Sequence, residues 1–92
     1  MSLLEKIDSD LVTAMKERVV SQVSVLRMLK SSIKNEQIKL GHELSDDEVM
    51  TVLKREAKQR RDSIEQYDKA GRDDLSSAEK MELEVIKSYL PE

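Results

Sequence analysis

The sequence contains no cysteine, which excludes disulfide bonds and cysteine-ligated zinc. Any zinc site would need carboxylates and the single histidine, His42. No apolar run approaches the roughly 20 residues that a membrane-spanning helix needs. The first residues, "MSLLEKIDSD", lack the basic flank and long apolar centre of a secretory signal peptide. We therefore expect a soluble, cytoplasmic protein that does not span a membrane.

Phenylalanine and tryptophan are also missing, and Tyr67 and Tyr89 are the two aromatic residues. Leu, Ile, Val, Met and Ala fill the apolar positions among many Lys, Arg, Glu and Gln residues, a composition that favours helices. The 38% charged content would be compatible with disorder, but the apolar residues recur at helical spacing. A chain of 92 residues can build one modest core. The sequence thus predicts one all-α domain over residues 1–92.

Helical spacing predicts four helices, over about residues 2–17, 20–40, 46–70 and 76–90. Gly41 and Gly71 follow the second and third as C-terminal stops. Ser45 and Glu48 have the spacing of a capping box, and the fourth helix is expected to begin near Ser76. Short connections favour antiparallel neighbours, so we expect an antiparallel four-helix bundle or two packed helical hairpins. The positions predicted to face the core are Leu4, Ile7, Leu11, Ala14, Gln22, Leu26, Leu29, Ile33, Leu40, Val49, Leu53, Ala57, Ile64, Tyr67, Ala78, Met81, Val85, Ile86 and Tyr89.

Charge is unevenly distributed, because residues 18–61 carry an excess of cations although the whole chain has a net charge of -3. Cations at helical spacing form one stripe on the second predicted helix and another on the third. The first stripe has no acid beside it on its own helix, whereas Asp62 and Glu65 follow cations of the second stripe by four residues. Each stripe is either an anion-binding surface or a solvated face. The six candidate nucleic-acid-binding residues are Arg27, Lys30, Lys34, Lys54, Lys58 and Arg61.

Arg60 differs from these cations because it projects into the apolar face of its helix. Glu56 lies one turn before it, so the two are predicted to form a structural polar pair. Alternatively, the arginine stem packs on the core while its head reaches water. Glu82 lies similarly within the apolar face of the fourth helix. An antiparallel arrangement could bring Glu82 toward Arg60, although the expected register places it closer to Ile64.

Catalytic machinery is hard to find in the sequence. His42 lies in a connection, "GHEL", where a lone histidine is usually a polar linker residue. Asp46, Asp47 and Glu48 are explained by capping and by the helix dipole. Only two glycines are present, so no glycine-rich phosphate loop can form. We therefore predict no catalytic residue, no metal ligand and no cofactor.

Three stretches carry a family resemblance: "LRMLKSSIKNEQI", "LSDDEVMTVLKREAKQRRDSIEQYDKAGRDDL" and "ELEVIKSYLP". Together they resemble the N-terminal domain of the YqeY family, which is similar to the tail of the GatB subunit of glutamyl-tRNA/aspartyl-tRNA amidotransferase. The resemblance implies a four-helix N-terminal bundle followed by a smaller helical domain, which is absent from these 92 residues. It also implies an association with holding tRNA.

These observations favour a noncatalytic helical module that binds structured RNA, with tRNA as the expected partner. Two alternatives remain. One is a protein-binding adaptor that docks on an aminoacyl-tRNA synthetase or an amidotransferase subunit. The other, implied by the resemblance, is an accessory to a carbon–nitrogen ligase that uses glutamine as amido donor.

Overall fold

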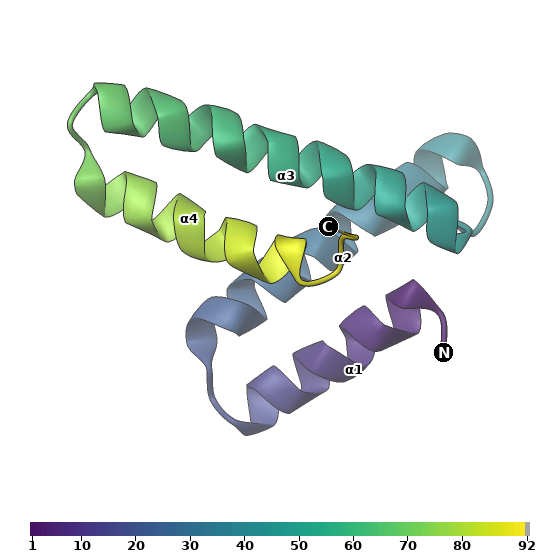
Figure 1. Cartoon of the computed structure of the whole chain (residues 1–92). Helices are drawn as coiled ribbons and strands as arrows, with labels where there is room; N and C mark the ends of the chain where they lie inside the picture. Colours follow the sequence, from purple (N-terminus) through teal and green to yellow (C-terminus); the bar gives the residue numbers. More distant parts are fainter. Residues whose placement is uncertain (92) are drawn as a thin grey trace. The chain divides into compact units, whose positions relative to one another are not determined.

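The computed structural model describes residues 1–91, which form four α-helices and no β-strand (Figure 1). These helices are α1 (Leu3–Lys16), α2 (Val20–Leu40), α3 (Asp46–Lys69) and α4 (Asp73–Lys87). The predicted all-α class is confirmed. Within the described part of the chain, no helix has both the length and the apolar character needed to cross a membrane.

The chain divides into two compact units, Met1–Val52 and Leu53–Glu92, and α3 runs from the first into the second. The single domain that we predict over residues 1–92 stays a prediction. In the first unit, α1 and α2 are antiparallel neighbours, because Asp8 pairs with Lys30 and the later Met15 contacts the earlier Arg27. The first turn of α3 joins α1 through a hydrogen bond of 3.0 Å from the Leu3 amide to Asp46.

Aliphatic packing forms the core of the first unit. Val25 is buried where the predicted stripe had placed Gln22, which is exposed. Leu40 was also predicted to be inside, yet its exposed fraction is 46%. It is the last residue of α2, directly before the C-terminal cap at Gly41. The buried hydrophobic residues of this unit are Ile7, Leu11, Ala14, Val25, Leu26, Leu29, Ile33, Val49 and Val52.

We expect Leu29→Ala to destabilise the protein by about 2 to 4 kcal/mol, because removing a fully buried leucine side chain loses transfer energy and leaves a cavity. Ile38 on the same helix is 71% exposed, so Ile38→Ala is the matched control and should cost less than about 0.5 kcal/mol. Urea unfolding of both variants measures the difference. Equal costs would show that Leu29 does not face the core.

In the second unit, the rest of α3 packs against α4, and the two helices run antiparallel. Arg60 of α3 contacts Glu82 late in α4, while Asp68 near the end of α3 pairs with Ser76 near the start of α4. The buried hydrophobic residues of this unit are Leu53, Ala57, Ile86 and Tyr89.

Helix α4 begins at Asp73, earlier than the predicted start near Ser76. Asp73 and Asp74 lie in its first turn, where their negative charge interacts favourably with the helix dipole. Ser76 is not a cap. It is buried inside the second unit, and its hydroxyl donates a hydrogen bond to the Asp68 carboxylate. Glu79 follows Ser76 by three residues, which is the spacing of a capping box, and this local spacing does not reveal the partner of Ser76 on α3.

The buried face of α4 is also rotated from the predicted one. Ala78 and Met81 were expected inside but are exposed, while Glu79 and Glu82 are partly buried on the same side as Ile86. The apolar pattern placed Glu82 within this face but missed Glu79, because spacing alone does not show that a partner on α3 can draw a second acid inward. Here the acids turn inward because Arg60 supplies an opposite charge.

Local sequence signals do identify the start of α3 and the end of α2. The Ser45 hydroxyl accepts a hydrogen bond from the Glu48 amide at 3.2 Å, and the Ser45 amide donates to the Glu48 carboxylate at 3.0 Å, which completes the predicted capping box. The Ser45 amide hydrogen bond lowers the pKa of Glu48 below its ordinary value, with a smaller contribution from the nearby His42. Gly41 ends α2 with a φ of 78°, a left-handed conformation that favours glycine.

Candidate functional site

The cations of α2 are Arg27, Lys30 and Lys34, and they differ in how they are compensated. Lys30 is half-buried, and its ammonium group lies 2.9 Å from a carboxylate oxygen of Asp8 on α1. Arg27 and Lys34 are exposed, and neither forms an ion pair with a described acid. Arg27 donates only a weak hydrogen bond of 3.6 Å to the sulfur of Met15. Sequence reasoning missed the compensation of Lys30 because Asp8 lies on a different helix.

A shallow groove of about 310 Å³ lies beside this stripe, between α1 and α2. Lys30 and Lys34 line it together with the hydroxyl-bearing Ser31 and the amide-bearing Gln37, and Asp8 contributes the only acid of its lining. Two cations with neighbouring hydroxyl and amide groups are the side chains that contact phosphates and sugars in nucleic-acid complexes. The groove therefore extends the candidate surface of α2 beyond its charged residues.

The cations of α3, Lys54, Lys58 and Arg61, are all exposed and follow one side of the helix. Lys58 forms the expected ion pair with Asp62, at 3.2 Å. Glu65, which we expected to compensate Arg61, instead pairs with Lys69 at 3.1 Å. Lys54 and Arg61 have no ion-pair partner among the described acids.

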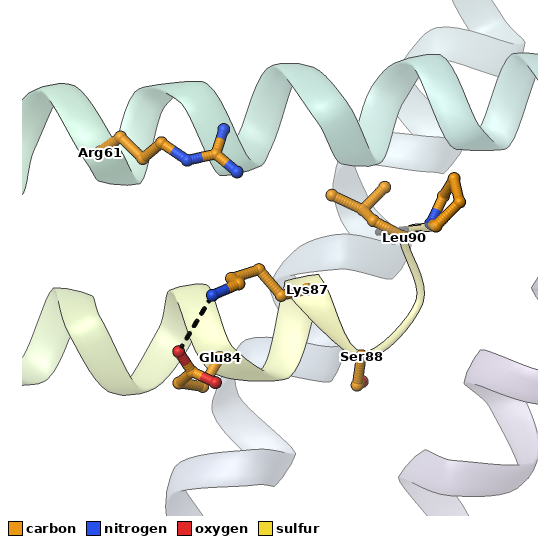
Figure 2. A pocket seen from close by; sticks show the side chains of 6 residues that line it. Arg61, Glu84, Lys87, Ser88 and Leu90 are labelled. Atoms are coloured by element: carbon orange, nitrogen blue, oxygen red, sulfur yellow. Dashed lines mark hydrogen bonds and ion pairs between the residues drawn. The ribbon is translucent and has the colours of Figure 1, made fainter.

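Arg61 also lines a cleft of about 620 Å³ in the second unit, and Figure 2 shows its side chain extending from α3 toward this space. Lys87 and Glu84 enter the same cleft from α4 and form an exposed ion pair of 3.4 Å. Sequence reasoning missed Lys87, although pairing α3 with an antiparallel α4 could have identified it. The cleft adds a second cation beside Arg61.

Glu56, Arg60 and Glu82 are brought together inside the second unit, joined by Glu79. Arg60 donates from Nη1 to Glu56 at 2.8 Å, and both side chains are less than a tenth exposed. Its Nε atom lies 3.4 Å from a carboxylate oxygen of Glu82 and 3.9 Å from one of Glu79. Glu82 reaches Arg60 rather than Ile64 because α4 begins earlier than expected, which shifts the register of the antiparallel pair. The structural role predicted for these residues agrees with this arrangement and stays a prediction.

Three carboxylates thus surround one guanidinium group. Burial raises the pKa of Glu79 above its ordinary value, and the negative charge of Glu82 raises it further, while Arg60 lowers it. The order of these effects means that Arg60 does not fully offset the cost of keeping Glu79 ionised. The folded protein therefore favours the neutral form of Glu79. The stability that this side chain contributes is fully present below the ordinary glutamate pKa and is lost as the pH rises through the raised pKa.

We expect Glu79→Gln to raise the melting temperature at pH 7, because glutamine removes a charge that burial disfavours. The difference should vanish as the pH falls below the ordinary glutamate pKa of about 4.3, where both side chains are neutral. Thermal unfolding at pH 7 and pH 4 measures the effect. The control is Glu84→Gln, because Glu84 lies on the same helix and its exposed pair with Lys87 should contribute little. A stabilisation that is equal at both pH values would contradict the assignment.

Across residues 1–91, no cluster of three or more His, Cys, Asp or Glu side chains has an arrangement that could hold a metal ion. His42 contacts the backbone oxygen of Glu43 at 2.7 Å and lies 3.6 Å from the carboxylate of Glu48. These contacts place it at the start of α3 as a neighbour of the capping box.

The fold and these surfaces define a small all-helical protein module with exposed cations on α2 and α3. The chain belongs to the YqeY-like protein family, whose model matches residues 4–92. The resemblance to the YqeY family stated from the sequence is confirmed.

Three relatives add detail. "Altered inheritance of mitochondria protein 41, mitochondrial" of Clavispora lusitaniae is 35% identical over 97% of this chain and 52% of its own length. The protein of the same name in Lachancea thermotolerans is 37% identical over 88% of this chain and 44% of its own. An uncharacterized protein of Schizosaccharomyces pombe is 33% identical over 89% of this chain and 67% of its own. The chain thus spans about half the length of the two mitochondrial relatives.

The predicted cytoplasmic location is wrong by this comparison, because these relatives are named as mitochondrial proteins. The prediction was based on the missing secretory signal and the missing cysteines. Those features argue against secretion, but they do not distinguish the cytoplasm from the mitochondrial interior.

Proposed function

We propose that this chain is a noncatalytic helical module that binds structured RNA, with tRNA as the partner. The observation that carries the proposal is the set of exposed cations in the two stripes of α2 and α3 that have no carboxylate partner among the described residues. A solvated helix face in a chain of net charge -3 has acids available to neutralise it, as Asp62 does for Lys58. The unpaired cations of the two stripes are Arg27, Lys34, Lys54 and Arg61.

Phosphate contacts would supply the affinity. Each lysine or arginine that neutralises a phosphate releases condensed counterions, and this release drives binding without base-specific contacts. Arginine can hold a phosphate through two parallel hydrogen bonds, whereas lysine acts as a compact point charge. The family resemblance to the amidotransferase tail, which is associated with holding tRNA, supports tRNA as the RNA.

Lys30 and Lys58 form a second class of contact, because each already has an acidic neighbour. The side chains of their pairs with Asp8 and Asp62 are between 42% and 74% exposed, and such pairs contribute only about 0 to 1 kcal/mol. A phosphate can therefore replace either carboxylate at small cost. We propose that these two lysines join the RNA contact only when the carboxylates are displaced.

The test is a titration of fluorescently labelled total tRNA with the whole chain, followed by anisotropy. The proposal predicts saturable binding at low salt, with competition by unlabelled tRNA and none by an acidic protein of similar net charge. Saturable binding to tRNA identifies an RNA-binding module. If tRNA does not bind at 50 mM salt, the protein-binding adaptor takes the place of this proposal.

A further inference from the structure

The cleft between α3 and α4 in the second unit combines charge with an apolar wall, which a solvated helix face does not have. Arg61 and Lys87 supply two cations, and Leu90 and Pro91 supply apolar surface. A volume of about 620 Å³ falls in the range of small-ligand pockets. The cleft is thus large enough for an anionic group attached to a flat organic ring.

The charges in the cleft are not equivalent. Lys87 lies in the last turn of α4, where the carbonyl groups carry partial negative charge, and a cation in this turn compensates them. The Ser88 hydroxyl also donates to the Val85 carbonyl at 2.6 Å, which satisfies one of these groups. With the helix end compensated, Arg61 remains as surplus positive charge, because no described carboxylate forms an ion pair with it.

Glu84 is the only acid of the lining, and it does not block the cleft. Its ion pair with Lys87 is long, at 3.4 Å, and both side chains are at least half exposed. Water already screens such a pair, so exchanging the carboxylate of Glu84 for a phosphate costs little. Once displaced, Glu84 can accept a hydrogen bond from an exocyclic amino group of a base.

We infer that this cleft receives one unpaired nucleotide of a bound RNA, and this inference rests on the proposed RNA-binding function. The phosphate lies between Arg61 and Lys87, and the base lies against Leu90 and Pro91. Arginine suits this position because its planar group can bind a phosphate and also stack on a base. Lys87 thereby becomes a binding residue for single-stranded RNA.

The test compares two fluorescent RNAs, a blunt-ended hairpin and the same hairpin with a four-nucleotide single-stranded 3′ extension. We expect the extended hairpin to bind the whole chain about fivefold more tightly, the lower end of measured base-stacking contributions, because the wall is aliphatic. Lys87→Gln should remove this preference and leave the affinity for the blunt hairpin nearly unchanged. Lys80→Gln is the matched control, because Lys80 lies on the same helix, is exposed and does not line the cleft.

Each result has a defined meaning. Equal affinity of the wild-type chain for both hairpins overturns the nucleotide site and leaves the proposed RNA binding intact. A preference that survives Lys87→Gln also overturns it. If neither hairpin nor tRNA binds, the proposed function and the cleft site both fail. A titration with free AMP distinguishes a mononucleotide site from an RNA site. If AMP alone shifts the amide NMR signals of Ser88 and Leu90 while both hairpins bind with equal affinity, the cleft is a mononucleotide site and not an RNA site.

Discussion

Replacing Arg60 with methionine is expected to reduce the free energy of unfolding by about 3 to 5 kcal/mol, the range seen when one partner of a buried ion pair is removed. The side chains of Arg60 and Glu56 are only 8% and 9% exposed, so solvent cannot take over the lost interaction. The variant also leaves Glu79 and Glu82 without their shared counter-charge. Because small domains are stable by about 5 to 15 kcal/mol, this loss is a large share of the total.

A second variant distinguishes the loss of the ion pair from the loss of side-chain packing as the cause of the destabilisation. Arg60→Met combined with Glu56→Leu removes both members of the most buried pair, and replacing a whole ion pair with apolar groups is often close to neutral. The double variant should therefore be more stable than Arg60→Met alone, a coupling that a double-mutant cycle in urea measures. If both changes simply add, Glu56 and Arg60 do not act as a pair.

Arg60→Met also separates structure from RNA binding. Arg60 is buried against three carboxylates, so we expect the folded variant to keep the tRNA affinity of the wild-type chain. Arg60→Lys keeps a positive charge and serves as the milder variant if methionine prevents folding. Lost tRNA binding at unchanged stability would assign Arg60 to the RNA surface instead.

The tRNA affinity is expected to fall about 100-fold when salt is raised from 50 to 200 mM, provided the four unpaired cations each neutralise one phosphate. If Lys30 and Lys58 also exchange Asp8 and Asp62 for phosphates, six contacts give a fall of about 1,000-fold. The salt dependence therefore counts the contacts and shows whether the paired lysines take part. A fall of about tenfold would correspond to two contacts, such as those of a single stripe. Binding that does not depend on salt would contradict the proposal.

Charge variants test the same surface directly. Lys34→Glu with Lys54→Glu removes one unpaired cation from each stripe, and the slope of log affinity against log salt should fall by about two. Lys6→Glu with Lys69→Glu is the matched control, because it changes the net charge equally at two exposed lysines outside the stripes. Equal effects of the two double variants would show that binding follows net charge and not the stripes. Melting temperatures verify that each variant is folded.

The contribution of each cationic stripe to RNA binding is part of this prediction. We expect Arg27 and Lys34 of α2 to contact the same RNA as Lys54 and Arg61 of α3. If reversing Lys34 weakens binding but reversing Lys54 does not, the surface is confined to α2.

The sequence by itself determined the features that depend on residues close together in the chain. Periodic aliphatic residues specified a helical chain and most of the first unit's core, because one turn of helix repeats every 3.6 residues regardless of what surrounds it. The capping box of Ser45 and the helix end at Gly41 could be predicted for the same reason, because each depends on one turn of backbone. The pair of Lys58 with Asp62 also follows directly from a spacing of four residues.

Only the tertiary structure decided which side chains meet across helices. Helix register determines three such arrangements. Lys30 pairs with Asp8, Ser76 is buried against Asp68, and Arg61 lines the same cleft as Lys87. Register is set by connection length and side-chain packing, and an earlier start of α4 was enough to move Glu82 along α3 to Arg60. Periodicity describes one helix at a time, so it identified the cations of each stripe but not which of them are neutralised by another helix.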